Sequence, residues 1–409
     1  VINCLQPISQ IINDYTPVLA LNPCNNSLTV EDASEFGIGD TVLVIQMKGA
    51  DIDSTNTIQF GDVININGAG NYEFNYVSQK TGNILSLRNR LTRTYNIPNG
   101  KVQLVRVPYY NSISVTDTLT CLPWDGSKGG VLAFHVRDTL QLNANIDVSG
   151  KGFRGGMGMN TLLNSTNCGQ TNYFFPSSSL VAASKGEGIA SISNNISSGR
   201  GPLANGGGGG QDHNSGGGGG GNGAVGGLGG YQWQDCTGAV DNRGLGGKVQ
   251  AYSNAINKIF LGGGGGAGHC NNLGFNSNGG NGGGIIIIRS DKIRNNGYQI
   301  ISKGAEAAAC TPNGNFGYCH EGMGGGGSAG TILLEINTAI DAALINTTGG
   351  NGGSMSGEDV GKLGPGGGGS GGVTWFKSAT QPTNFSVLDN GGSNGVNINI
   401  GNDPFGATP

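Results

Sequence analysis

One pattern of apolar and polar residues recurs four times along the chain. Each copy has a pair of small residues, an apolar stretch of four to six residues, a polar bend, a second short apolar stretch and an exit of small residues. The copies are "GGVLAFHVRDTLQLNANIDVSGKG" from Gly129, "GGIIIIRSDKIRNNGYQIISKG" from Gly283, "AGTILLEINTAIDAALINTTGG" from Ala329 and "GGVTWFKSATQPTNFSVLDNGG" from Gly371. The last three begin about 40 residues apart, which is typical of stacked units that bury a core only against their neighbours.

Adjacent apolar residues within the repeats indicate strands that are covered on both sides. "IIII", "TILLEI" and "VLAFHV" lack the strict alternation of a strand with one face in water. Short strands, tight turns and this period predict a parallel β-helix, or a closely related β-solenoid, with more than one strand per coil. Its inward rows are expected to include Val131, Ile286, Leu333 and Trp375.

The first part of the chain has a different pattern. "GDTVLVIQMKG", "GNYEFNYV", "GNILSLRNRL" and "KVQLVRVPYY" are alternating or continuous β-patterns separated by Gly, Asn and Asp turns. We therefore predict an all-β protein with four regions. They are a small β barrel or sandwich over residues 1–110, the first solenoid coils over 111–156, a glycine-rich insertion over 157–281, and solenoid repeats with glycine runs and a carboxy-terminal strand over 282–409.

Glycine supplies 81 of the 409 residues, nearly three times ordinary usage. Isolated glycine runs behave as flexible linkers. Because glycine keeps its N–H and has no side chain, extended threefold segments could instead lie side by side and hydrogen-bond laterally. We expect ordered packing for at least some runs, since flanking strands hold each run near a β-unit. The longest runs are Gly206–Gly210, Gly216–Gly221, Gly262–Gly266, Gly324–Gly327 and Gly366–Gly369.

The low charge narrows the choice of partners. Only 12% of residues are charged and the formal net charge is -4, so the chain has no basic surface for phosphates and we expect no nucleic-acid partner. The longest aliphatic run, Ile285–Ile288, is far short of the roughly 20 residues that cross a bilayer. Val1 begins without a signal-peptide pattern, which fits a mature chain whose leader has been removed or an engineered start.

The eight cysteines are even in number and scattered, and none forms a Cys-x-x-Cys pair. This arrangement favours disulfides in an oxidising compartment over zinc ligands, and therefore an extracellular protein. A link between Cys4 and Cys24 is expected first, because only a short segment separates them. The disulfide candidates are Cys4, Cys24, Cys121, Cys168, Cys236, Cys270, Cys310 and Cys319.

No catalytic constellation stands out in the sequence. An enzyme on a β-helix would cut polysaccharide with clustered carboxylates or a groove of Asp, Arg and Lys. The residues of these types around the first repeat equally suit polar turns and solvent-facing strand positions. They are Arg137, Asp138, Asp147, Lys151 and Arg154. We therefore predict no enzyme activity, no catalytic residue and no cofactor.

Metal and phosphate sites have little support. The four histidines share no ligand spacing, and "QDHNS" at His213 and "GHC" at His269 are expected to be solvated loops, with metal binding as the alternative. Asp51 and Asp53 could donate oxygens to calcium, but they lack the regular spacing of a calcium loop. No glycine run ends in Gly-Lys-Ser/Thr, so none is a phosphate loop.

Aromatic residues lie in or beside the glycine-rich insertions. We expect most of them to be lids packed over glycine segments. The alternative is an adhesive surface for carbohydrate or protein, since aromatic rings offer large contact area at little entropy cost. The residues are Tyr231, Trp233, Tyr252, Phe275, Phe316 and Tyr318.

"GDTVLVIQMKGA", "GNYEFNYV", "VQLVRVPYY", "PWDGSKGGVLAFHV" and "IDVSGKGFRGG", followed by glycine arrays, resemble secreted surface proteins of Bacteroidetes that are associated with gliding motility and exported by the type IX system. The resemblance is specific from about Phe36 to Gly156 and compositional across the glycine arrays. It implies an extracellular or cell-surface, adhesin-like role with no established catalytic site. Those proteins usually close with a carboxy-terminal sorting domain, whereas this chain ends in "NDPFGATP".

The same resemblance implies glycosylation of Ser or Thr in short motifs that begin with Asp. The matching positions in this chain are Thr41, Ser54, Thr118 and Thr139.

The chain is therefore expected to be an extracellular structural or adhesive surface protein whose partners are copies of itself or surface glycans. The alternatives are a polysaccharide-binding or polysaccharide-cleaving β-helix protein, and an ice-binding face, which would need regular threonine ranks that the repeats lack. Assembly into a filament is expected through strand addition. The terminal segments "VINCLQPISQIINDYTPVLALN" and "VNINI" are β-prone and could pair with an exposed edge of a neighbouring copy.

Overall fold

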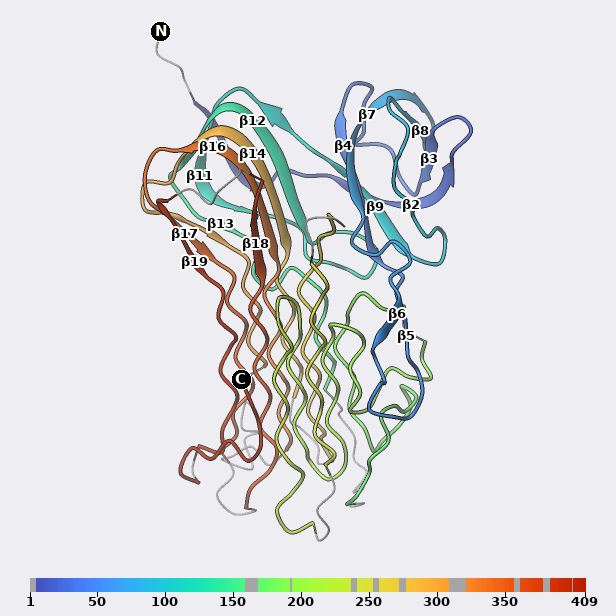
Figure 1. The fold of residues 1–409 in the computed structure, drawn as a ribbon, viewed down its shortest axis with the longest axis vertical. Helices are drawn as coiled ribbons and strands as arrows, with labels where there is room; N and C mark the ends of the chain where they lie inside the picture. Colours follow the sequence, from blue (N-terminus) through green and yellow to red (C-terminus); the bar gives the residue numbers. More distant parts are fainter. Residues whose placement is uncertain are drawn as a thin grey trace.

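The structure is a computed structural model of the chain. It describes residues 5–158, 168–191, 193–236, 241–252, 257–271, 277–308, 321–356, 361–377, 383–398 and 400–409. Within these ranges the chain forms nineteen β-strands and no helix. Figure 1 shows a barrel and a parallel-strand solenoid at one end of the molecule, with long extended segments running from them to the other end.

The predicted barrel is present and has six antiparallel strands. They close in the order β2-β3-β8-β7-β4-β9. Their bounds are β2 (Tyr15–Asn22), β3 (Ser27–Val30), β4 (Thr41–Lys48), β7 (Tyr72–Thr81), β8 (Ile84–Leu87) and β9 (Lys101–Arg106). A hairpin of β5 (Asp51–Ile52) and β6 (Val63–Asn65) leaves the barrel and lies along the extended segments.

Strand β4 explains how the barrel joins the solenoid. Its residues Val42 and Val44 belong to the core inside the barrel. The alternate residues Leu43 and Ile45 belong to a second core that the barrel shares with the solenoid. Since successive side chains of a strand point to opposite faces, the continuous apolar run of β4 reflects burial on both sides.

The solenoid contains the four repeats as four strand pairs in parallel register. Their bounds are β12 (Val131–Leu142) with β13 (Ile146–Asp147), β14 (Ile285–Arg294) with β15 (Gln299–Ile301), β16 (Thr331–Ala339) with β17 (Ala343–Asn346), and β18 (Val373–Phe376) with β19 (Phe385–Leu388). The first strands stack in the order β12-β14-β16-β18, and the second strands in the order β13-β15-β17-β19. An earlier coil contributes β10 (Tyr109–Tyr110), beside β12, and β11 (Ile113–Thr120), which joins the two columns. The predicted β-solenoid architecture is therefore confirmed.

The inward row expected from the sequence mixes the two faces of the first column. It comprised Val131, Ile286, Leu333 and Trp375. Leu333 does align with Trp375, but Ile286 aligns with Leu132 instead of Val131. Trp375 packs against Tyr252, outside the solenoid columns, at 5.9 Å between ring centroids. A register shift of one residue exchanges the faces of a strand, and four consecutive isoleucines do not reveal which register applies.

Both terminal segments, which the filament hypothesis uses, make contacts within the chain. Strand β1 (Gln6–Ile11) pairs in parallel with β11 of its own chain. The residues that follow are also bound internally, because Asn13 Nδ2 donates to the Ala133 carbonyl at 2.7 Å and the Tyr15 hydroxyl to the Val131 carbonyl at 2.7 Å. At the other end, Asn397 forms isolated bridges instead of the expected strand. Within one chain these segments therefore pair internally, and assembly into a filament stays a prediction.

The glycine runs, which lie between the strand pairs in the sequence, form a bundle of extended segments held by backbone hydrogen bonds. The segment 216–221 lies inside this bundle, and its N–H groups donate to three neighbours with a period of three residues. Gly216 and Gly219 donate to segment 227–230, Gly217 and Gly220 to 323–326, and Gly218 and Gly221 to 205–208, at 2.8–3.0 Å.

The carbonyl groups of the same segment follow the same period. They accept N–H groups from three further neighbours, the segments 244–247, 367–370 and 263–266, at 2.8–3.3 Å. The segment 216–221 thus has six hydrogen-bonded neighbours. A period of three is the geometry of the polyproline II type of helix, which leaves its backbone groups free for lateral bonding.

Close approach of the segments explains why glycine is needed in this part of the chain. A Cβ atom on Gly218 would lie 2.2 Å from the carbonyl oxygen of Leu245. The obstructing atoms belong to backbone, which cannot turn aside as a flexible side chain can. Ordering glycine costs more conformational entropy than ordering any other residue, so the bundle depends on its many mutual hydrogen bonds.

A charge cluster around the buried Glu187 fixes the bundle to the barrel. Lys48 of β4 places Nζ 2.7 Å from Oε1 of Glu187, and Arg154 places Nε 3.0 Å from Oε2. The indole N–H of Trp124 donates to the same Oε2 at 3.1 Å. Burial opposes the charged form of Glu187, but Lys48 and Arg154 outweigh it and lower its pKa to about 2.

Two adjacent glycines at the edge of the bundle provide a test of this packing. A Cβ on Gly392 would lie 2.1 Å from the Gly350 carbonyl oxygen, whereas on Gly391 its nearest neighbour would be the Gly369 oxygen at 3.4 Å. We expect Gly392→Ala to lower the free energy of unfolding by about 3 kcal/mol or more. Gly391→Ala should change it by no more than about 0.5 kcal/mol. Thermal unfolding of both variants checks this, and equal effects would contradict the packing described.

The charge cluster leads to a second prediction. Glu187→Gln leaves the buried Lys48 without its carboxylate and should cost about 3–5 kcal/mol of stability in chemical denaturation. Combined with Lys48→Met, it should cost clearly less than the sum of the two single changes, because the uncompensated charge is then removed. The control is Lys292→Met, in the solvent-exposed pair with Asp138, which should change stability far less than the buried substitutions do. Additive effects of the two buried changes would refute the coupling.

Candidate functional site

The far end of the glycine bundle carries the loops that join its segments (Figure 1). The segment 258–270 illustrates the distance involved. Leu261 belongs to the core shared by the barrel and the solenoid, whereas His269 is buried among polar residues at the other end. At about 3.1 Å per residue, the eight steps between them span roughly 25 Å. We call this region the loop end; the residues that meet there are 168–181, 211–215, 231–236, 269–271, 354–356 and 361–363.

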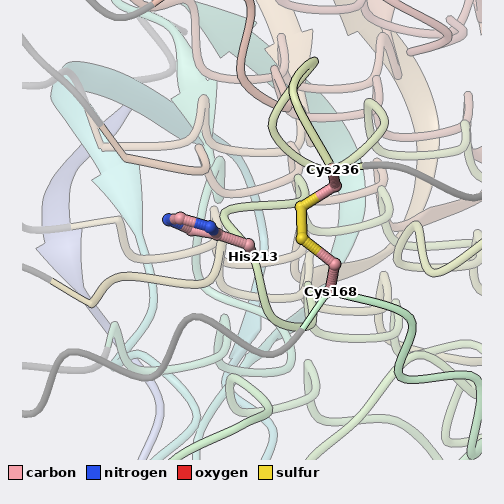
Figure 2. Close-up of side chains that lie close together, drawn as sticks. All are labelled: Cys168, His213 and Cys236. Atoms are coloured by element: carbon pink, nitrogen blue, oxygen red, sulfur yellow. A yellow bond between two sulfur atoms is a disulfide. The ribbon is translucent and has the colours of Figure 1, made fainter.

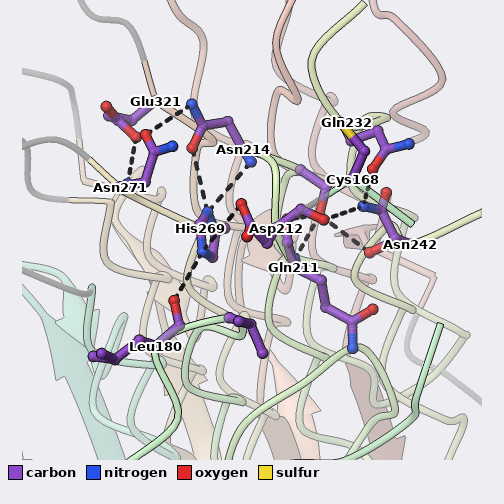
Figure 3. A network of polar contacts seen from close by, with 12 residues as sticks. Cys168, Leu180, Gln211, Asp212, Asn214, Gln232, Asn242, His269, Asn271 and Glu321 are labelled. Carbon is purple, nitrogen blue, oxygen red and sulfur yellow. Dashed lines mark hydrogen bonds and ion pairs between the residues drawn. The ribbon is translucent and has the colours of Figure 1, made fainter. Parts of the chain in front are cut away.

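His269 is the centre of a buried polar network at the loop end (Figure 3). Its side chain is fully buried. Nε2 lies 3.3 Å from the Leu180 carbonyl oxygen, and Nδ1 accepts the Asn214 N–H at 3.3 Å. Asp212 places Oδ1 4.0 Å from Nε2. Burial lowers the pKa of His269 to about 4, so the imidazole is neutral at pH 7. The expectation of a solvated loop is therefore wrong for His269.

The network continues through amide side chains into neighbouring loops. Asn214 Nδ2 donates to Asn271 Oδ1 at 3.3 Å, and the Asn271 N–H donates to Glu321 Oε2 at 2.8 Å. Asn242 Nδ2 donates to the Asp212 carbonyl at 2.9 Å and to Gln232 Oε1 at 2.7 Å. These bonds tie together loops that are far apart in the sequence.

A disulfide and an apolar cluster hold the same loops. Cys168 and Cys236, 68 residues apart, form the disulfide, and His213 lies beside it (Figure 2). Trp233 packs against a small core of Met323, Met355 and Leu363. Its ring centroid is 5.1 Å from that of His213. The loop end is thus fixed by covalent, apolar and polar contacts together.

The remaining aromatic candidates have different surroundings. Tyr231 is 40% exposed and packs against Phe405, at 5.9 Å between ring centroids, with the Arg243 guanidinium 4.3 Å from its centroid. Tyr252 lies close to the solenoid, where it also contacts Phe260. Phe275, Phe316 and Tyr318 lie outside the described residues.

Sequence reasoning missed a second aromatic group in the segment "NYFFP". Phe174 stacks on the buried Phe60 of the barrel hairpin at 5.6 Å. The Arg200 guanidinium lies 5.1 Å from the ring centroid of Tyr173. Three consecutive aromatic residues inside a polar, glycine-rich region were the available signal. This group fixes the base of the exposed loop 176–178.

The prediction that most cysteines are paired stays a prediction, because three of the eight lie outside the described residues. Cys24 is an exposed free thiol, and Cys121 is a buried free thiol whose pKa is raised by burial to about 12. Cys270 is buried. Cys4, Cys310 and Cys319 lie outside the described residues. Because Cys4 is the expected partner of Cys24, the predicted link between them also lies outside the described residues.

The candidate catalytic residues of the first repeat take separate structural roles. Asp138 pairs with Lys292 at 3.2 Å. Asp147 accepts the Ser149 N–H at 2.8 Å, as in a polar turn. Arg154 belongs to the cluster around Glu187, while Arg137 is exposed and the Lys151 carbonyl accepts the Trp124 N–H.

The remaining predicted positions lie on the barrel and the solenoid. Asp51 accepts an amide proton of Asn67 at 2.6 Å, and Asp53 accepts the N–H and the hydroxyl of Thr55 within its own turn. Of the glycosylation candidates, Ser54 and Thr118 are exposed and Thr41 and Thr139 are half-buried.

Comparisons with known proteins place few limits on this chain. No family model and no curated protein matches it. Among solved structures it is similar to the Gp54 tailspike of Acinetobacter baumannii bacteriophage AP22, in complex with A. baumannii capsular saccharide, at 14% identity and a TM-score of 0.17. The match covers 34% of this chain and a quarter of that one (25%), which is too small a likeness to support an argument about this protein. The described residues include no helix that could span a membrane.

Burial of His269 predicts a pH dependence of stability. Its pKa is about 4 in the folded chain and about 6.5 when unfolded. Between these two pH values, His269 is protonated in the unfolded chain but not in the folded chain. The free energy of unfolding should therefore fall by up to about 3 kcal/mol as the pH is lowered from about 6.5 to about 4. His135, whose pKa is also lowered to about 4 by burial, adds a similar effect.

A comparison with His269→Gln isolates the contribution of His269. The variant should be less stable than the wild type at pH 7, but its stability should fall less steeply between pH 6.5 and 4. Denaturant titrations across this range check the prediction. Identical slopes for both proteins would mean that His269 is not buried in neutral form.

Proposed function

We propose that this chain is an extracellular adhesive protein that binds its target through the loop end of the glycine bundle. One observation carries the proposal, namely the arrangement in which segments with hydrogen-bonded backbones and almost no side chains separate the β-structures from a compact set of loops. A bundle of this kind offers little side-chain chemistry along its length. Side chains able to recognise a partner are concentrated where the segments turn, and binding residues are commonly found on loops held by a rigid scaffold.

Pre-organisation of the loops supports a binding role. The disulfide, the cluster around Trp233 and the network around His269 restrain them before any partner arrives. Loops that are already ordered lose less entropy on binding, so more of the contact energy contributes to affinity.

The chemistry of the loop end favours surface glycans as the target. The stretch "TNYFFPSSS" places amide and hydroxyl side chains around a fixed aromatic group. Amides and hydroxyls match the donors and acceptors of sugar hydroxyls, while aromatic residues offer rigid contact area. The low charge of the chain fits a target recognised without strong electrostatic attraction.

A solvent-accessible disulfide is consistent with a secreted protein, because such bonds persist in oxidising compartments. The expected resemblance to Bacteroidetes surface proteins agrees with the same location. Glycosylation of Ser54 and Thr118, both exposed, is part of this proposal.

Site-specific labelling with a bulky polymer tests which end of the molecule binds. Cys24 is an exposed free thiol in the turn between β2 and β3 of the barrel, and Ser178 is exposed at the loop end. Polyethylene glycol is attached either to Cys24 or to Ser178→Cys in a Cys24→Ser background. Retention of each protein is then measured on an array of immobilised bacterial, plant and animal polysaccharides and on intact bacterial cells.

We expect the polymer at position 178 to reduce retention at least about tenfold, equivalent to about 1.4 kcal/mol, by blocking access to the loop end. The polymer at Cys24 should leave retention unchanged. Blocking from Cys24 alone would move the binding surface to the barrel. Retention no greater than that of an unrelated protein on every surface would refute the adhesive function itself.

A further inference from the structure

Cys168, His213 and Cys236 are the one group of three potential metal ligands found among the described residues. One ligand atom from each residue lies within 4.8 Å of the other two (Figure 2). The two sulfurs are joined in the disulfide. Nδ1 of His213 is buried and has no hydrogen-bond partner. Since buried polar atoms are nearly always paired, this imidazole beside two sulfur atoms requires an explanation.

We propose that Cys168, Cys236 and His213 bind Zn²⁺ when the disulfide is reduced, so that the loop end has two mutually exclusive cross-links. Thiolates and imidazole are the ligands that zinc prefers, and three protein ligands leave the fourth tetrahedral position open to water. Two soft sulfur donors disfavour calcium and magnesium, which take oxygen ligands.

The two states are related by a balanced exchange. A dithiol reductant gives two electrons and two protons to the disulfide, which becomes two cysteine thiols while the reductant becomes a cyclic disulfide. Zinc then displaces both thiol protons and binds the two thiolates together with the neutral imidazole. Burial lowers the pKa of His213, which keeps its imidazole neutral and able to bind a metal at pH 7.

The zinc form would connect more of the loop end than the disulfide does. The disulfide links the loop of Cys168 to that of Cys236. Zinc would add the loop 211–215 through His213, next to the network that holds Asp212 and Asn214. A reduced chain would therefore keep its loops together when metal is present.

Cobalt(II), which occupies zinc sites and absorbs light, provides the direct test on the full chain. The protein is reduced with dithiothreitol, freed of reductant without oxygen and titrated with Co²⁺. In the chain that retains Cys168 and Cys236, we expect a thiolate-to-cobalt charge-transfer band that reaches a plateau as Co²⁺ is added. The band should disappear when Zn²⁺ is added. The oxidised chain should show no such band. His213→Ala should weaken cobalt binding at least about tenfold and change the spectrum. Cys24→Ser, at the exposed free thiol, should have no effect.

Alkylation of the unmutated chain gives a readout that does not depend on a variant folding. The reduced protein is treated with iodoacetamide with and without Zn²⁺, and the modified cysteines are identified by peptide mass spectrometry. Zinc should slow the modification of Cys168 and Cys236 but not that of Cys24. Equal rates at Cys168 and Cys236 in both conditions would overturn the proposal. So would His213→Ala with unchanged cobalt affinity and spectrum.

Discussion

The hydrogen bond from the N–H of one extended glycine segment to a carbonyl of the next is the interaction on which the rest of the molecule depends. In a threefold helix, the backbone N–H and C=O groups of successive residues are rotated by a third of a turn. Each segment can therefore hydrogen-bond to several neighbouring segments. The solenoid gives these bonds a starting point. Residues just before β14 and β16 already bond from one coil to the next along the first column, as Gly283 does to Ser328 and Ala329 to Ser370. The spacing of paired strands, about 4.8 Å, is thereby passed on to the bundle.

Much of the β-structure could be predicted from the sequence because strands and turns leave local signals. The four repeats and the barrel were predicted from apolar runs and turn residues. The register of Ile286 could not be, since identical neighbours carry no information about which face is inside. Burial of Leu43 and Ile45 against the solenoid also required the structure. A strand that is buried on both faces has the same continuous apolar sequence whichever element covers it.

The bundle and the loop end were less predictable for a related reason. Glycine runs are alike, so the sequence cannot show which segments are neighbours. His269 looked like a loop residue because glycine surrounds it, yet it is fully buried. The usable signal was positional. Polar residues interrupt or follow the runs in "GGGGGQDHNSGGGGGG" and "GGGGGAGHC", and segments of similar length bring such residues to the same end of the bundle.

The period of three in the bundle constrains how the length of such a chain can change during evolution. Removing one residue from the segment 216–221 would turn every later N–H toward a neighbour that already has its partner. Removing three would restore the direction of each group and shorten the segment by one full turn. Insertions and deletions inside the bundle are therefore compatible with the fold in multiples of three residues. The loops that join the segments can change length by any number of residues. A protein built in this way can vary its loops freely on a scaffold whose length changes only in whole turns.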